Sequence, residues 1–114
     1  MSRKSRAEFD PLRSLAFGSI SGTYANVGAA TDEPVSAFRV TNNTNGDLIV
    51  SVDGGTTDHL FVASGSFVLY DVRSNKNTGN QDNFVLPTGT QFAVKQSTAP
   101  SEGAVYIDVL HDAP

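Results

Sequence analysis

The chain has 114 residues, 39% of them hydrophobic, which suffices for one folded domain and is too short for two. It contains no cysteine, so these residues can form neither a disulfide nor a thiolate metal site. The net charge of −4 argues against a nucleic-acid-binding domain, which would be basic.

Residues 1–13 are predicted to form a basic N-terminal arm. They contain the cations Arg3, Lys4, Arg6 and Arg13 and two carboxylates, a net charge of +2, whereas the four cations and ten carboxylates of residues 14–114 give −6. We expect this arm to dock on an acidic protein surface such as a neighbouring copy of the chain, with a solvated terminus as the alternative. Deleting it should then weaken assembly without lowering the thermal midpoint of the monomer.

The chain also lacks an apolar stretch of the length that a signal peptide or a membrane helix needs. We therefore expect a soluble protein that makes no membrane contact and is not exported by the general secretory route.

From Leu15 onward, short runs rich in Val, Ile, Phe and Tyr alternate with clusters of Gly, Asn, Asp and Ser, a pattern typical of strands linked by turns. No apolar stripe of helical period extends over three turns, so no long helix is expected. The expected strands are 15–21, 24–27, 37–42, 48–53, 59–62, 66–72, 84–86, 91–96 and 104–110. Seven to nine short antiparallel strands at this spacing predict an all-β fold, a single β-sandwich or jelly-roll-like domain over residues 14–114.

The segment between strands 37–42 and 48–53 contains the step Asn45-Gly46. Asn-Gly supplies the two positive-φ positions that a tight two-residue turn requires. The sequence therefore predicts that these two strands form a β-hairpin.

Strands 66–72 and 104–110 carry apolar residues on both faces. Such strands are expected to lie centrally in a sheet or to have their second face covered by a partner. Their tyrosines, Tyr70 and Tyr106, are accordingly candidate interaction residues, together with the four cations of the arm. The wholly polar segment 73–82 is long for a loop in a compact domain and is a candidate binding element.

No residues form a convincing catalytic or cofactor-binding set. The chain has only two histidines, His59 and His111, and Asp58 and His59 should point to opposite faces of a strand. No serine lies in the G-x-S-x-G turn of a hydrolase nucleophile. The sequence thus predicts a protein that is not an enzyme and has no cofactor.

The loop 53–58 could still hold calcium, because it contains two carboxylates. It lacks the EF-hand pattern, since the twelfth position after Asp53 inclusive is Ser64 rather than glutamate. A glycine-permitted turn at Gly54-Gly55 is the simpler interpretation, and an irregular calcium loop is the alternative.

Several stretches, in this order, resemble small β-rich virion structural proteins of tailed bacteriophages. They are FRVTNNTNGDLIVSVD (38–53), GGTTDHLFV (54–62), SFVLYDVRSNK (66–76), LPTGTQFAVK (86–95) and APSEGAVYI (99–107). The resemblance covers about residues 35–110. It implies a non-catalytic virion subunit, assembled in the host cytoplasm, that decorates or stabilises the capsid or forms a ring at the head–tail junction.

The implied partners are other copies of the chain and other virion proteins, such as the major capsid, portal, neck or tail proteins, without direct nucleic acid contact. A carbohydrate- or receptor-binding β-sandwich module is the alternative, and it would present exposed aromatic residues near loops 53–58 and 73–83.

Overall fold

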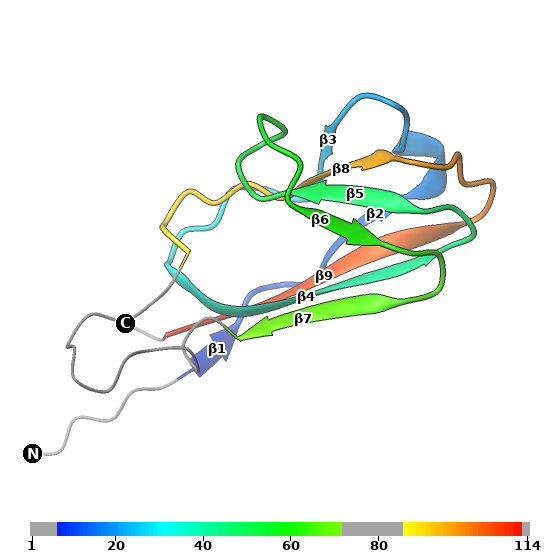
Figure 1. The fold of residues 1–114 in the computed structure, drawn as a ribbon. Helices are drawn as coiled ribbons and strands as arrows, with labels where there is room; N and C mark the ends of the chain where they lie inside the picture. Colours follow the sequence, from blue (N-terminus) through cyan, green and yellow to red (C-terminus); the bar gives the residue numbers. More distant parts are fainter. Residues whose placement is uncertain (1–6, 72–85, 113–114) are drawn as a thin grey trace, which may run out of the picture.

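Two antiparallel β-sheets face each other across one apolar core in the computed structural model, which describes residues 7–71 and 86–112 (Figure 1). The strands are β1 (Ala7–Phe9), β2 (Arg13–Ala16), β3 (Ala25–Asn26), β4 (Val35–Thr44), β5 (Leu48–Ser51), β6 (Leu60–Val62), β7 (Phe67–Asp71), β8 (Ala93–Gln96) and β9 (Gly103–Asp112). The first sheet has the order β1-β9-β4-β7, with β2 also pairing with β9, and the second has the order β3-β8-β5-β6. This arrangement confirms the predicted all-β sandwich.

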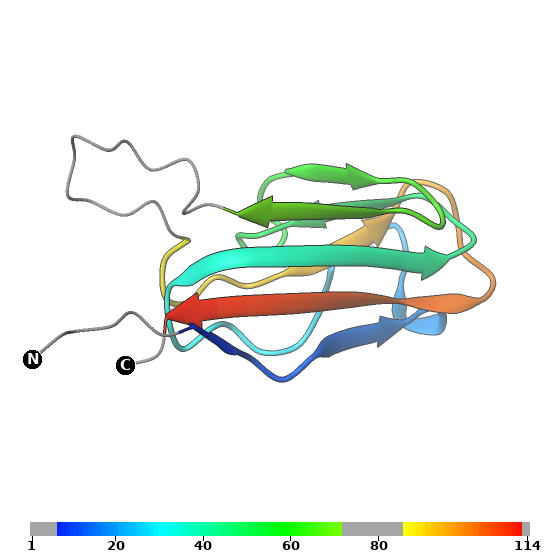
Figure 2. The same ribbon diagram turned by 90° about the horizontal axis from the view of Figure 1, so that it is seen from below.

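The core follows from the alternation of side chains along the two ten-residue strands, β4 and β9. They lie side by side in the middle of the first sheet, with β1 and β2 on one side and β7 on the other (Figure 2). Their inward residues pack against those of the second sheet and are buried. These residues are Phe38, Val40, Val105, Ile107 and Val109 from the first sheet and Leu48, Val50, Val62 and Val94 from the second.

The predicted hairpin between residues 37–42 and 48–53 is wrong. β4 belongs to the first sheet and β5 to the second, so the connection crosses from one layer to the other. Gly46 has no positive φ, and no described residue other than glycine has one. Glycine is needed at position 46 for space, because a Cβ there would collide with the carbonyl oxygen of Thr98. The Asn-Gly step therefore marks a crossing between sheets.

A buried polar network holds this crossing. The Asn42 side-chain amide donates to the carbonyl oxygens of Gly46 at 2.8 Å and Val62 at 2.9 Å. Its oxygen accepts from the backbone N–H of Thr44 at 3.0 Å and from the Thr44 hydroxyl at 2.7 Å. Asn42 thus provides hydrogen-bond partners for backbone groups that have no strand partner where the chain crosses between the sheets.

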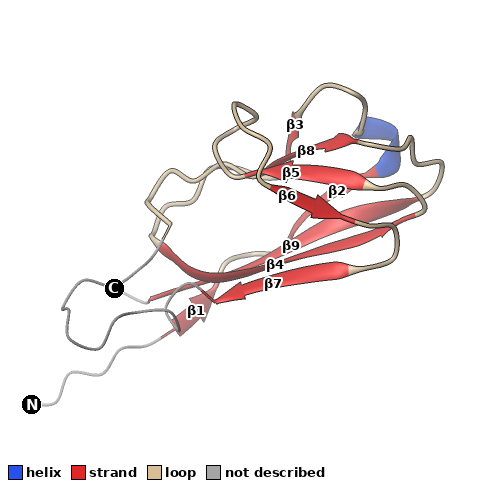
Figure 3. Ribbon diagram, viewed as in Figure 1, coloured by secondary structure: helices blue, strands red, loops and turns tan. Residues whose placement is uncertain are grey.

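Three other expectations need adjustment. The strand predicted at 15–21 ends at Ala16, because a 3-10 turn, η1 (Phe17–Ser19), follows it and the Ile20 amide donates to the Phe17 carbonyl (Figure 3). β7 lies at an edge of its sheet rather than in the centre, whereas β9 pairs on both sides as expected. Of the predicted strand 84–86, only Leu86 is described, and it bridges to Val35.

The described part of the proposed arm is paired with the domain. β1 and β2 both run antiparallel to β9, with Phe9 opposite Leu110 and Arg13 opposite Ile107. The three cations Arg3, Lys4 and Arg6 lie outside the described residues, as does the polar segment 73–82.

Candidate functional site

The outer face of the first sheet carries large apolar side chains in solvent. Phe9, Phe67 and Leu69 are 74%, 60% and 63% exposed. They border a groove of about 470 Å³, the apolar groove, whose lining includes Phe9, Arg39, Phe67, Leu69, Asp108 and Leu110. Monomeric proteins seldom leave such a group of residues exposed without a functional reason. The apolar groove is therefore a candidate interaction site.

Strand register places an ion pair in the middle of this groove. Leu69 of β7 lies opposite Arg39 of β4, which in turn lies opposite Asp108 of β9. The Arg39 guanidinium donates to Asp108 Oδ2 at 2.6 Å, and both side chains remain partly exposed. The groove thus has one positive and one negative charge at its centre and apolar residues on both flanks.

The two candidate tyrosines lie on opposite faces of the first sheet. Tyr106 alternates with the buried Val105 and Ile107, so it is half-buried on the outer face. Tyr70 faces inward at the edge, where its ring stacks on Phe38 with centroids 5.5 Å apart and stays 47% exposed. The structure therefore does not bring the two tyrosines together.

Tyr70 instead lines a second hollow, of about 290 Å³, at the mouth between the sheets. Its other lining residues include Val52, His59, Leu60 and Leu86. The hollow opens between the sheets and the apolar groove lies on the outer face of the first sheet, and Phe38 is the one described residue that lines both.

Arg13 makes its contacts within the chain. Its side chain is 9% exposed, and its guanidinium donates to the Ala29 carbonyl at 3.2 and 3.3 Å and pairs with Asp10 at 3.2 Å. Asp10 also contacts the buried His111, with Oδ1 2.8 Å from Nε2. These contacts hold the segment that connects β1 and β2 against the end of β9.

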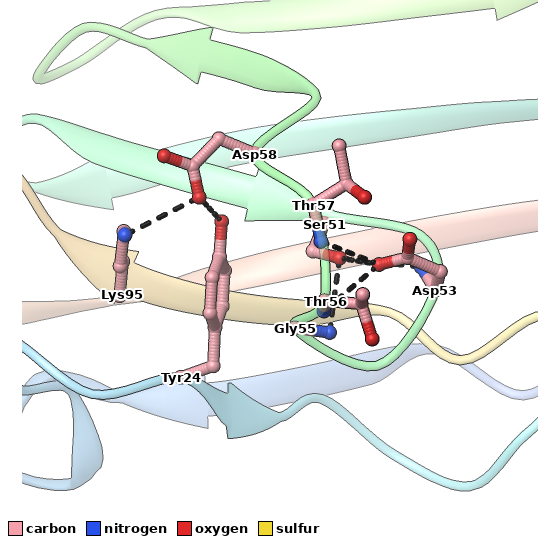
Figure 4. Close-up of polar contacts among 8 residues, drawn as sticks. All are labelled: Tyr24, Ser51, Asp53, Gly55, Thr56, Thr57, Asp58 and Lys95. Atoms are coloured by element: carbon pink, nitrogen blue, oxygen red, sulfur yellow. Dashed lines mark hydrogen bonds and ion pairs between the residues drawn. The ribbon is translucent and has the colours of Figure 1, made fainter.

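The loop after β5 is a turn built around the Asp53 carboxylate (Figure 4). Its Oδ1 accepts from the Ser51 hydroxyl at 2.5 Å and from the backbone amides of Thr56 and Thr57 at 3.1 and 3.0 Å. These donors, the Ser51 hydroxyl first, hold the pKa of Asp53 well below its usual range. Gly54 and Gly55 have φ of 79° and 104°, as a glycine-permitted turn requires.

This geometry favours the turn over the calcium loop, because hydrogen-bond donors already surround the carboxylate oxygen. Within residues 7–71 and 86–112, no group of three or more His, Cys, Asp or Glu side chains could hold a metal ion.

A second polar cluster joins Tyr24, Asp58 and Lys95 on the outer face of the second sheet (Figure 4). Asp58 Oδ1 accepts from the Tyr24 hydroxyl at 2.5 Å and lies 3.2 Å from Lys95 Nζ, which stands 4.9 Å above the Tyr24 ring. The hydrogen bond from Tyr24, then that from Lys95, lowers the pKa of Asp58. Burial, followed by the bond to Asp58, raises the pKa of Tyr24.

Asp58 and His59 therefore serve different partners. His59 Nδ1 accepts from the Val52 amide at 3.1 Å, while the Asp58 carboxylate turns to Tyr24 and Lys95. The adjacent pair does not form an acid–imidazole unit, although both residues precede β6 rather than alternate within a strand as expected.

Phe9, Phe67 and Leu69 were not among the interaction residues predicted from the sequence. Leu69 could have been found from its alternation with Val68 and Tyr70 once one face was assigned to the core. Phe9 gives no such signal, because β1 is only three residues long and its partner is β9, about a hundred residues away.

Comparisons with known proteins bear on the fold. No family model matches the sequence, and no curated protein matches it. A solved structure from Bacillus endospore appendages, described as a novel family of disulfide-linked pili, matches with a TM-score of 0.54 and 14% sequence identity. The match covers 98% of this chain and 93% of that chain, and at this identity it shows a shared fold alone. The part of the chain that the structure describes has no helix long and apolar enough to cross a membrane.

Proposed function

We propose that this chain is a non-catalytic structural subunit of a particle built from many copies. The setting that the sequence resemblance favours is the virion of a tailed bacteriophage, where the subunit decorates or stabilises the capsid or forms a ring at the head–tail junction. The observation that carries the proposal is the apolar groove, whose exposed Phe9, Phe67 and Leu69 would gain burial against a neighbouring subunit.

The contacts that His59 and His111 make within the fold support a non-catalytic role. His59 binds the Val52 amide, and His111 is buried against Asp10. The described carboxylates near them, Asp58 and Asp10, are tied to Tyr24 and Arg13 respectively. These contacts give all four side chains structural partners at loops and strand ends.

The chemistry of the chain also determines how its subunits would be joined. The structurally similar appendages form disulfide-linked pili. The 114 residues of this chain contain no cysteine, so they cannot be joined to a neighbouring subunit by a disulfide. Apolar burial and charge pairing can supply the association, and the apolar groove offers both.

Purified particles test the proposal. We expect quantitative mass spectrometry of purified virions to find the chain at many copies per particle. Antibody labelling in electron microscopy should mark regular positions on the head or at the head–tail junction. Presence only in the lysate of infected cells, and never in virions, would contradict the proposal. Labels repeated along a filament would assign the subunit to an appendage instead, and glycan-dependent binding without particle association would favour the carbohydrate-binding alternative.

A further inference from the structure

We propose that the apolar groove is an interface between two copies of this chain, related by a two-fold axis that runs parallel to β4 and β9. This inference rests on the proposed function and names the partner of that same site. The groove lies on the outer face of the first sheet, which Figure 2 shows with β4 and β9 side by side in its centre. The occupant is the same groove of a second copy.

The charges of the groove are self-complementary. Arg39 and Asp108 lie directly opposite each other on β4 and β9 and are 2.6 Å apart. A half turn of a second copy about an axis between these strands brings Arg39 of each copy over Asp108 of the other. A groove lined by charges of one sign would require a different partner, whereas one charge of each sign about a central axis matches its own copy.

The same rotation also covers the exposed side chains on the two flanks of the ion pair. Phe67 and Leu69 lie on the β7 side of the ion pair, and Phe9 and Leu110 lie on the β1 side. The half turn exchanges the two sides and keeps the level of each residue along the strands. Phe67 is level with Tyr106 and Ser14, so it covers these residues of the other copy. Phe9 is level with Ala37, so it lies over Ala37 and the end of β7 of the other copy.

The exposed area is of the right order for a dimer. An aromatic side chain carries about 150–250 Å² of surface, so Phe9 at 74% and Phe67 at 60% exposure together offer roughly 200–330 Å², and Leu69, 63% exposed, adds to this area. A standard interface buries about 800 Å² on each partner. The three side chains therefore supply close to half of that area, and Leu110, Tyr106 and the stems of the ion pair lie beside them.

A matched pair of substitutions isolates this face. Phe67 on the edge strand β7 is 60% exposed, and Phe61 on the edge strand β6 of the other sheet is 59% exposed. Phe67→Lys places a charge inside the proposed interface, whereas Phe61→Lys makes the same chemical change on the opposite side of the sandwich. Thermal unfolding monitored by circular dichroism shows whether each variant is folded.

Sedimentation equilibrium from about 1 µM to about 1 mM measures a weak dimer, with a Kd in the micromolar to millimolar range. We expect the wild type to dimerise increasingly as its concentration rises. The dimer Kd should be at least tenfold higher for Phe67→Lys and within about twofold of wild type for Phe61→Lys. A monomeric wild type over the whole range, or equal effects of the two variants, would overturn the inference. The proposed function would still stand after either result if purified virions contain the chain.

A charge exchange tests the axis itself. Asp108→Arg alone places two arginines opposite each other across the interface and should weaken the dimer at least tenfold. The double variant Arg39→Asp with Asp108→Arg restores every pair in the two-fold arrangement, so dimerisation should recover to within about threefold of wild type. Recovery supports the axis, and failure of the double variant to recover, with an unchanged thermal midpoint, overturns it.

Discussion

Asn42 shows how one polar side chain can determine the path of this chain. It is fully buried, and its four hydrogen bonds satisfy groups of Thr44, Gly46 and Val62. Asn42→Ala would leave those buried groups without partners, so we expect a loss of about 2–4 kcal/mol in the free energy of unfolding. Urea denaturation measures it. The neighbouring exposed Asn43→Ala is the control and should change the free energy by less than about 0.5 kcal/mol. Equal losses for the two variants would contradict the role of the network.

Asp53 predicts a dependence of stability on pH. Its folded-state pKa is lowered, so it stabilises the fold fully above its unfolded pKa of about 3.9, and this contribution is lost as the pH falls further. Asp53→Asn removes the titration. We therefore expect wild type to melt above the variant at neutral pH, and the difference between their thermal midpoints to shrink between about pH 5 and pH 2.

The exposed Asp32→Asn variant controls for the loss of one negative charge. A difference between wild type and Asp53→Asn that stays constant across this pH range would show that the turn does not act through the ionised carboxylate.

Residue-level reasoning from the sequence succeeded where the function of a residue is local. The turn at Gly54-Gly55 is such a case, because positive φ is a property of the glycines themselves. It failed at Gly46, where glycine is required by the approach of residues 98–100 from a distant part of the chain. Such an approach is visible only after the fold is known.

The N-terminal strands give a prediction at the level of elements. A truncated chain lacking residues 1–12 loses β1 and also Asp10, which pairs with Arg13 and contacts the buried His111. We expect its free energy of unfolding to fall by about 2–4 kcal/mol, because two largely buried cationic or polar groups lose their carboxylate. This reverses the expectation for a free arm, whose removal would leave the monomer's thermal midpoint unchanged.

A shorter truncation that removes only residues 1–6 is the control, since the described strands begin at Ala7. We expect its thermal midpoint to match that of the full chain. If both truncated chains have the same thermal midpoint as the full chain, the pairing of β1 with β9 contributes nothing to stability.

Strand existence was predictable for the long elements, and strand pairing was not. Alternation identified residues 37–42 and 104–110, which form the middle of β4 and β9. Pairing partners depend on which layer each strand joins. A short turn sequence such as Asn45-Gly46 predicts a hairpin from local preference, but burial of both β4 and β5 in opposite layers outweighs that preference here.

At the scale of the whole molecule, the chain passes repeatedly between the two sheets. β3 joins the second sheet, β4 the first, β5 and β6 the second, β7 the first, β8 the second and β9 the first. The central pair, β4 and β9, therefore joins segments far apart in sequence, such as Arg39 and Asp108, which are 69 residues apart. Folds dominated by such distant contacts refold in milliseconds to seconds, because a long loop has to close before the contacts form.

We expect the contacts that limit the folding rate to form between β4 and β9. Two matched substitutions test this expectation. Val40 on β4 and Val62 on the edge strand β6 are both fully buried, so each change to alanine should cost about 2 kcal/mol of stability. If β4 and β9 pair in the transition state, Val40→Ala slows refolding by about tenfold, whereas Val62→Ala leaves refolding within about threefold and mainly accelerates unfolding. Stopped-flow refolding and unfolding in urea measure both rates. The opposite pattern, slow refolding with Val62→Ala only, would place the nucleus in the second sheet.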